Sequence, residues 1–259
     1  MNFFALLGRF VLNFLEVLGR VTLFTLYAVK SAVKPPYYKS AVMKQIMEIG
    51  YYSLPVVGLT AIFTGMVLSL QSYTGFSRSG FGAEGSIASI VVISITRELG
   101  PVLAALMVAG RIGASTAAEI GTMRVTEQID ALVTLSTNPF KYLIAPRLIA
   151  AIITLPLLVL VSDIIGVYGG YLVGIHKLGF SPNGYLRATL ESLEFMDVMS
   201  GLTKAAVFGF LITLMGCYHG FHSKGGAQGV GIATINAVVS SSILILCSNY
   251  IITQLFFTH

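Results

Sequence analysis

Two adjacent charged residues, Arg97 and Glu98, stand in the middle of a stretch that is otherwise apolar enough to cross a membrane. Pro101 follows, and because proline has no amide hydrogen, the carbonyl group of Arg97 loses its usual helical donor. Asp163 and Lys204 lie within two later apolar stretches. Ionisable side chains are costly in lipid and normally face the interior of a helix bundle or a water-filled cavity. The four charges sum to zero, so we expect them to form one neutral polar cluster.

Two interpretations of this cluster are open. A rise of ~1.5 Å per residue places Arg97 close to the bilayer midplane and places Asp163 and Lys204 in the outer half of the bilayer. A structural network of salt bridges would need no ligand. A cavity built around the same charges would instead receive a polar or zwitterionic head group.

A polar segment over 116–135 has the character of a docking helix. Thr116 and Glu119 have the spacing of a capping box, in which two side chains satisfy the free amides at the start of a helix. The pattern predicts one amphipathic helix over 116–135, between two membrane spans. This helix would dock on a partner domain, and the alternative is that it packs on its own bundle or on the lipid surface. Its polar positions are Glu119, Arg124, Glu127 and Asp130.

Other signals of chemistry are missing from the sequence. No G-x-x-x-x-G-K-[ST] motif is present, so we expect no nucleotide binding by a P-loop. His219 and His222 lie close to Cys217 without a further ligand beside them, and we expect no metal site there. No nucleophile is paired with a base. We therefore expect no catalytic residue and no cofactor in this chain.

The composition predicts the elements that position these residues. The chain has 259 residues, of which 55% are hydrophobic and 10% charged, whereas a soluble domain has roughly 25% charged residues. We expect an all-α integral membrane protein, with a single membrane domain over 1–259. Stretches long enough to cross the ~30 Å hydrocarbon core predict five spans, at 49–76, 85–110, 148–175, 198–218 and 230–257.

The first predicted helix, over 3–29, differs from a span. Its polar residues Arg9, Asn13, Glu16 and Arg20 are four, three and four positions apart, which places them on one helical face. We expect this amphipathic helix to lie in the membrane interface.

The distribution of positive charge predicts the orientation. With the N-terminus in the cytoplasm, the inner side holds eleven Lys and Arg residues and the outer side holds three, as the positive-inside rule requires. The C-terminus would then face outside. The net charge of +5 indicates cytoplasmic loops and anionic lipid rather than nucleic acid. No internal repeat is visible, which argues against secondary transporters built from inverted repeats.

The stretch around Arg97 also carries a specific family motif. It reads Arg97-Glu98-Leu99-Gly100-Pro101 and continues through Ala109-Gly110-Arg111, Ala118-Glu119-Ile120-Gly121, Met123-Arg124 and Thr126-Glu127-Gln128. A further likeness covers Gly65-Met66-Val67-Leu68, Gln71, Pro146-Arg147, Leu155-Pro156 and the Lys204 segment. Over nearly its whole length the sequence resembles the MlaE (YrbE) permease family, the membrane subunits of ABC transporters that work with MCE-domain proteins.

The resemblance implies a homodimer in the inner membrane of a Gram-negative bacterium, with the C-terminus in the periplasm. Its partners would be a cytoplasmic ABC ATPase that binds ATP and Mg, a STAS-domain protein and a periplasmic hexamer of MCE-domain proteins. The complex would move phospholipid between the inner and outer membranes and maintain the lipid asymmetry of the outer membrane. ATP would be hydrolysed in the partner chain.

The resemblance also implies roles for single residues. The helix over 116–135 would be the coupling helix that docks in the ATPase. The lipid cavity would be lined by Arg97, Glu98 and Lys204, with Leu68, Gln71 and Tyr73 as wall residues. Asp163 is assigned to the same cavity only because of its calculated depth in the bilayer, and not because of the resemblance. The rival hypotheses are a proton-coupled secondary transporter of an amphiphilic substrate, with Glu98 or Asp163 carrying the proton, and a non-transporting membrane scaffold.

Overall fold

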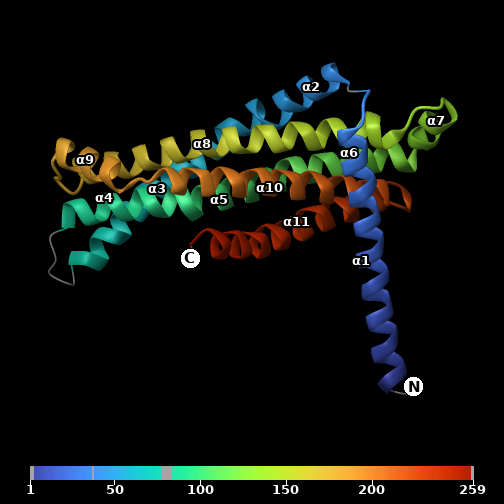
Figure 1. Ribbon diagram of the computed structural model, residues 1–259, viewed down its shortest axis with the longest axis horizontal. Coiled ribbons are helices and arrows are strands. Elements are labelled where there is room, and N and C mark those ends of the chain that lie inside the picture. The colour runs from blue at the N-terminus through green and yellow to red at the C-terminus, as the bar shows by residue number, and fades with distance from the viewer. Residues whose placement is uncertain (1–2, 37, 78–82, 258–259) are drawn as a thin grey trace.

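The protein is described here from a computed structural model that covers residues 3–36, 38–77 and 83–257. Within these residues every regular element is a helix, as predicted (Figure 1). Five helical stretches are long and apolar enough to cross a membrane, which agrees with the five predicted spans. They are Lys39–Phe76, Gly85–Val125, Phe140–His176, Phe195–Phe221 and Gly226–Phe257.

The spans are made from several consecutive helical elements. The first contains α2 (Lys39–Ile49), the 3-10 turn η1 (Tyr51–Ser53) and α3 (Leu54–Ser77). The second contains α4 (Ala83–Ser94), η2 (Ile95–Leu99), α5 (Gly100–Val108), η3 (Ala109–Gly113) and α6 (Ala114–Val125). The third contains η4 (Phe140–Ile144) and α8 (Ala145–His176). The remaining helices are α1 (Phe3–Val33), α7 (Gln128–Thr134), α9 (Pro182–Ser192), α10 (Phe195–Phe221) and α11 (Gly226–Phe257).

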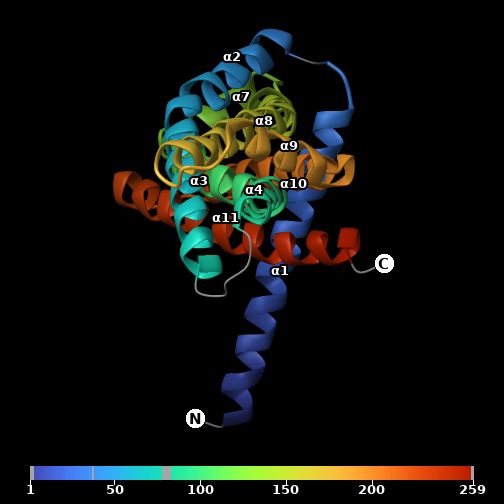
Figure 2. The same cartoon turned by 90° about the vertical axis from the view of Figure 1, so that its left-hand side faces the viewer.

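The long helices form one elongated bundle with two distinct ends. In Figures 1 and 2, α9 and the start of α4 lie at one end, and α6 and α7 lie at the other. Glycines allow the closest contacts inside the bundle. Gly65 on α3 meets the backbone of Gly166 on α8, and Gly209 on α10 meets the backbone of Ala151 on α8. Neither glycine has room for a methyl group, so these pairs set the spacing of the helices.

Three five-residue π-helical segments, η2, η3 and η4, interrupt the spans. In η2 the amide of Gly100 bonds to the carbonyl of Ile95, five residues earlier. This wider turn lets the helix continue through Pro101 without a break, since proline cannot donate to the carbonyl of Arg97. The second span is therefore one continuous helical path, and it runs on to Val125 instead of ending near residue 110 as predicted.

The prediction of a single helix over 116–135 is wrong. Helix α6 ends at Val125, and α7 begins at Gln128. Between them Glu127 has a φ of +60°, a left-handed conformation that ends the first helix and turns the chain. The proposed capping box is also absent, because Thr116 is buried within α6, which continues directly from η3. We call the turn at 126–127 together with α7 the elbow.

The N-terminal helix α1 crosses the bundle steeply near one end and extends well beyond it (Figure 1). Its later part is anchored, because Phe24 is buried and its ring lies 5.2 Å from Phe140 and 5.5 Å from Tyr218. The predicted polar face includes Glu16 and Arg20, which are 3.8 Å apart, while the side chain of Arg9 lies outside the described residues. The helix is slightly longer than expected, and its location in the membrane interface stays a prediction.

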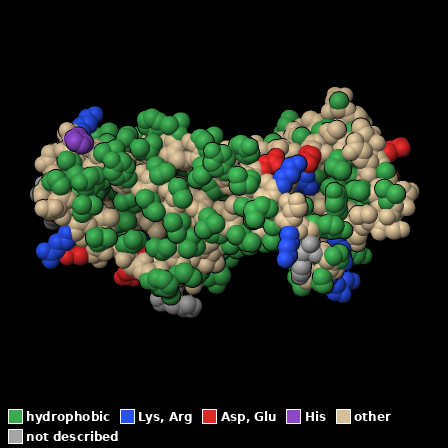
Figure 3. All heavy atoms as spheres, turned by 90° about the horizontal axis from the view of Figure 1, so that it is seen from above, with side chains coloured by type: hydrophobic (Ala, Val, Ile, Leu, Met, Phe, Trp, Pro, Cys, Tyr) green, Lys and Arg blue, Asp and Glu red, His purple; other side chains and the backbone are tan. Residues whose placement is uncertain are grey.

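Hydrophobic side chains cover the middle of the face seen in Figure 3 almost without a break, and charged side chains lie at its left end and over its right-hand part. Such a belt is what the hydrocarbon core of a bilayer requires of the helices that cross it.

Candidate functional site

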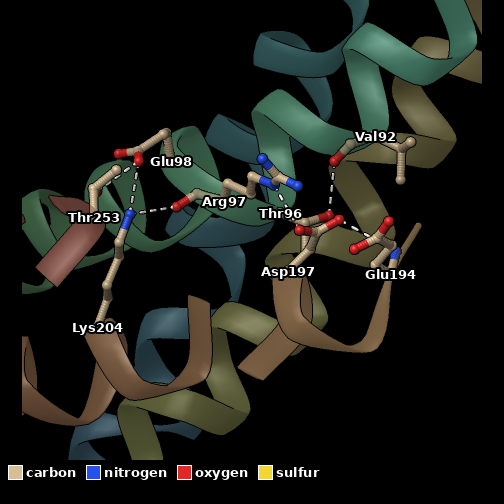
Figure 4. A network of polar contacts seen from close by, with 8 residues as sticks. All are labelled: Val92, Thr96, Arg97, Glu98, Glu194, Asp197, Lys204 and Thr253. Carbon is tan, nitrogen blue, oxygen red and sulfur yellow. Dashed lines mark hydrogen bonds and ion pairs between the residues drawn. The ribbon is translucent and has the colours of Figure 1, made fainter. Parts of the chain in front are cut away.

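A buried lysine organises the charged cluster in the middle of the bundle (Figure 4). Lys204 projects from α10, and its side chain is fully buried. Its ammonium group donates to Glu98 Oε1 at 2.8 Å and to the carbonyl oxygen of Arg97 at 2.7 Å. The second acceptor is the carbonyl that Pro101 leaves without a helical donor. The irregular turn in η2 therefore provides one hydrogen-bond acceptor for Lys204, and the carboxylate of Glu98 provides the other.

Helix α11 completes the surroundings of Glu98. Asn249 Nδ2 donates to Glu98 Oε2 at 2.7 Å, and the hydroxyl group of Thr253 donates to Glu98 Oε1 at 2.8 Å. The carboxylate thus joins the second span to both α10 and α11, although 39% of its side-chain surface stays exposed. Neither Asn249 nor Thr253 was predicted from the sequence to lie at this site. A signal was present, because Asn249 and Thr253 stand one helical turn apart in a span that has no charge.

Arg97 points away from Glu98 and has a different partner. Its Nε lies 2.6 Å from Oδ1 of Asp197, whose side chain is fully buried at the start of α10 (Figure 4). The other oxygen of Asp197 accepts the backbone amide of Glu194, so this carboxylate also caps α10. The guanidinium group lies 4.3 Å from the ring centroid of Phe257. Sequence reasoning missed Asp197 because it assigned 176–197 to a connection outside the membrane.

Asp163 does not belong to this network. Its Oδ1 is buried without a hydrogen-bond partner among the described residues and packs against Gly100, where there is no room for a methyl group. The expectation that Arg97, Glu98, Asp163 and Lys204 form a single cluster is therefore corrected. Two ion pairs, Lys204–Glu98 and Arg97–Asp197, form beside each other, and Asp163 stays apart from both.

Two of the three predicted wall residues lie at a cavity beside the network. Leu68 and Gln71 line a hollow of about 320 Å³ that also includes Leu99, the neighbour of Glu98 in η2. Gln71 lines a second, adjoining hollow of about 390 Å³ along α3. Tyr73 lines neither of these hollows, because it packs against the apolar core, with its ring 6.0 Å from Phe180.

The four residues predicted to couple the chain to an ATPase divide into two sets. Glu119 forms an ion pair of 2.7 Å with Arg147, which is almost completely buried in α8, while 49% of the Glu119 side-chain surface stays exposed. Of the other three, Glu127 and Asp130 belong to the elbow, and Arg124 lies at the end of α6 beside it. Arg124 bonds to Asp130 at 2.7 Å across the turn, and Glu127 is exposed at its tip.

The two histidines near Cys217 make contacts within the chain. The ring of His219 lies 3.0 Å from the hydroxyl of Ser240, and that of His222 lies 2.8 Å from the carbonyl of Tyr218. In the described part of the chain, no three metal-ligating side chains gather into a group.

Five apolar spans around a buried charge network define a multi-pass membrane protein. The chain belongs to the MlaE permease family, whose model, described as Permease MlaE, matches residues 42–255. It is accordingly an ABC transporter permease subunit and not itself the catalytic chain, and a permease of this class works with a partner ATPase.

Relatives over the whole length support this assignment. A probable ABC transporter permease protein of Rickettsia typhi is 60% identical over 99% of this chain and 98% of its own length. The intermembrane phospholipid transport system permease protein MlaE of Haemophilus influenzae is 34% identical over the same shares of both chains. The chloroplastic protein trigalactosyldiacylglycerol 1 of Arabidopsis thaliana is 37% identical over 83% of this chain and 61% of its own length.

Proposed function

We propose that this chain moves phospholipids between the inner and outer membranes of a bacterium and so helps to maintain the lipid asymmetry of the outer membrane. It acts as a homodimer in the inner membrane with a cytoplasmic ABC ATPase, a STAS-domain protein and a periplasmic hexamer of MCE-domain proteins. ATP and Mg bind to the ATPase, and this chain needs no cofactor of its own. The name of the Haemophilus influenzae relative, which is a phospholipid transport permease, supports the choice of cargo.

One observation carries this proposal. A continuous helical path, Gly85–Val125, joins the Glu98 network inside the bundle to the elbow at its end. Glu98 and Glu127 are separated by about 40 Å at ~1.5 Å per residue. A force on the elbow moves the second span as a unit, because its backbone hydrogen bonds resist bending. The bonds from Glu98 to α10 and α11 must then change, and with them the shape of the neighbouring cavity.

The cavity beside the network has the mixed character that a phospholipid needs. Leu68 and Leu99 offer apolar surface to an acyl chain, and Gln71 offers hydrogen bonds to a polar group. Glu98 and Arg97 remain partly exposed nearby, with 39% and 31% of their side-chain surfaces accessible. A head group reaching the network would meet both charges in a site of low dielectric constant, where such contacts are strong.

Two apolar helix faces support a homodimer. On α3, Leu59 and Phe63 are about 60% exposed, and Val67 is half exposed. On α11, Ile235 and Ile243 are similarly exposed. Helices α3 and α11 border the Glu98 network and its cavity, so a second copy on these faces would enclose the cavity between two protomers.

The charge distribution supports an orientation with the elbow in the cytoplasm. Arg111, Arg124, Lys141 and Arg147 lie on the segment that includes α6 and α7, whereas the end with α9 carries few basic residues. In this orientation the N-terminus is cytoplasmic and the C-terminus is periplasmic, and α1 lies along the inner interface.

The cargo is tested by photo-crosslinking in the assembled complex. We expect a photoreactive amino acid at Leu68 to capture phospholipid, with a yield that changes when ATP is hydrolysed. Leu157 on α8, which is 60% exposed, is the matched control, because it should capture bilayer lipid to the same extent with or without ATP. Capture at Leu68 that ATP does not change, or that contains no phospholipid, would contradict the proposal.

A further inference from the structure

A separate cavity of about 520 Å³ lies between α8, α9 and α10, with part of its wall from α4 and η2. It is larger than the hollows beside Glu98, and its lining shares no residue with them. Its size falls within the range of small-molecule sites, which are mostly apolar with a few placed polar groups. Its walls are chiefly aliphatic side chains and three tyrosines, and Asp163 is its only ionisable acid.

Two buried polar atoms of this lining have no hydrogen-bond partner among the described residues, the Tyr185 hydroxyl and Oδ1 of Asp163, and Asp163 is the only carboxyl group of the wall. Buried polar atoms are nearly always hydrogen-bonded, so a buried carboxyl oxygen with no donor requires an explanation. No cation in the described bundle is free to serve, because Lys204 is bound to Glu98 and Arg97 to Asp197. Asp163 lies near the middle of α8, about 20 Å from its last residue at ~1.5 Å per residue, so bulk water is distant.

The other polar side chains of the wall have partners or cannot take a charge. Thr96 donates to the carbonyl of Val92 at 2.7 Å, and Thr189 donates to that of Tyr185 at 2.9 Å. Burial raises the pKa of Tyr185 to about 12, so its phenol stays neutral. The demand for a donor is therefore concentrated at one carboxyl group.

Three tyrosine rings line the cavity together with Asp163. The rings of Tyr168 and Tyr171 are stacked with centroids 6.2 Å apart, and Tyr171 and Tyr185 meet edge to face at 5.8 Å. Aromatic faces attract ammonium groups through their quadrupoles, most strongly where water is excluded. A carboxylate and several aromatic rings around an apolar hollow are the combination that binds a quaternary or primary ammonium.

We propose that this cavity binds an amphiphile with a cationic ammonium group, which pairs with Asp163 while its hydrocarbon tail lies along the apolar wall toward α9. This inference goes beyond the proposed phospholipid transport and does not depend on it. An anionic ligand is disfavoured because the lining contains no basic side chain.

The test uses the full chain in complex with its ATPase, in a neutral detergent. The probe is dodecyltrimethylammonium with a photoreactive group in its tail, and the measured quantity is its half-saturation concentration. We expect labelled peptides from α8 and α9, and an increase in this concentration of about tenfold or more in Asp163→Asn, since the variant loses a charge-assisted contact. Glu191→Gln is the matched control, because Glu191 is an exposed carboxylate of α9 outside the lining, and its binding should equal that of the wild type.

Three further arms make the result decisive. Dodecanol with the same photoreactive tail is uncharged and should bind equally to the wild type and to Asp163→Asn. A loss of both probes would mean that the substitution damages the cavity itself and would overturn the proposal. Tyr168→Leu, which keeps apolar bulk, should weaken the ammonium probe alone. Dodecylphosphocholine distinguishes the two possible natural ligands. If its half-saturation concentration rises in Asp163→Asn, the ligand is a lipid with a cationic head group. If that concentration is the same in both proteins, the ligand is a free cationic amphiphile. Equal affinity of the ammonium probe for wild type and Asp163→Asn would refute the site.

Discussion

Replacing Lys204 by methionine keeps the long unbranched stem and removes the positive charge that α10 places against Glu98. Loss of one partner from a buried ion pair costs about 3–5 kcal/mol. The cost is lower here because 39% of the Glu98 side chain is exposed to solvent, and because Glu98 keeps its hydrogen-bond donors Asn249 and Thr253. With solvent screening taken into account, we assign about 2–3 kcal/mol to the loss of the ion pair. The carbonyl of Arg97 also loses its donor, which adds about 1 kcal/mol.

The sum predicts that Lys204→Met lowers the free energy of unfolding by about 3–4 kcal/mol, measured by far-UV circular dichroism during detergent titration. Glu98→Gln alone should cost about 2–3 kcal/mol, because it leaves the fully buried ammonium group of Lys204 without its counterion, although the amide oxygen can still accept a hydrogen bond. In the double variant no charge is left unpaired, so the two costs should fall short of additivity by about 1–2 kcal/mol. Lys177→Met, at an exposed lysine just beyond α8, is the control and should change little. Additive costs at Lys204 and Glu98 would refute the assigned pairing.

The remaining predictions concern the elbow. Arg124→Glu places two acids across the turn, so ATP hydrolysis should continue while lipid transfer falls severalfold, measured together in proteoliposomes. Adding Asp130→Arg to that variant restores the pair with reversed charges and should recover much of the coupling. Equal coupling in the wild type and in the single variant would show that the ion pair does not hold the elbow in its working geometry.

The sequence was sufficient to predict the spans, because hydrophobic length alone distinguishes a membrane helix. It also indicated that Glu98 and Lys204 belong together, since charges in lipid must find partners. The choice of partner could not be predicted. Asp197 was assigned to a loop because the start of α10 was placed too late, and Arg97 therefore had no obvious acid.

Other features depend on backbone geometry that composition does not encode. The helix breaks at Glu127, which adopts a left-handed backbone conformation although it is not glycine. Glycine is the residue that usually marks such a turn in a sequence, so this break could not be predicted. Thr116 fits the capping motif, but η3 continues the helix through it. Tyr73 stands only two positions after Gln71 in the same span, which is about 200° around the helix at 3.6 residues per turn. The two side chains therefore leave different faces of α3, and Tyr73 faces the core.

The claim that the second span links the ATPase to the lipid cavity through Glu98 is tested most directly by ATP-driven phospholipid transfer. The measurement compares wild type, Glu98→Gln and the control Glu191→Gln, reconstituted with the partner proteins. The account predicts that transfer by Glu98→Gln falls about tenfold, the effect of weakening one charged hydrogen-bond centre, while ATP hydrolysis persists and the control transfers lipid as the wild type does. Wild-type transfer by a correctly inserted Glu98→Gln protein would contradict it.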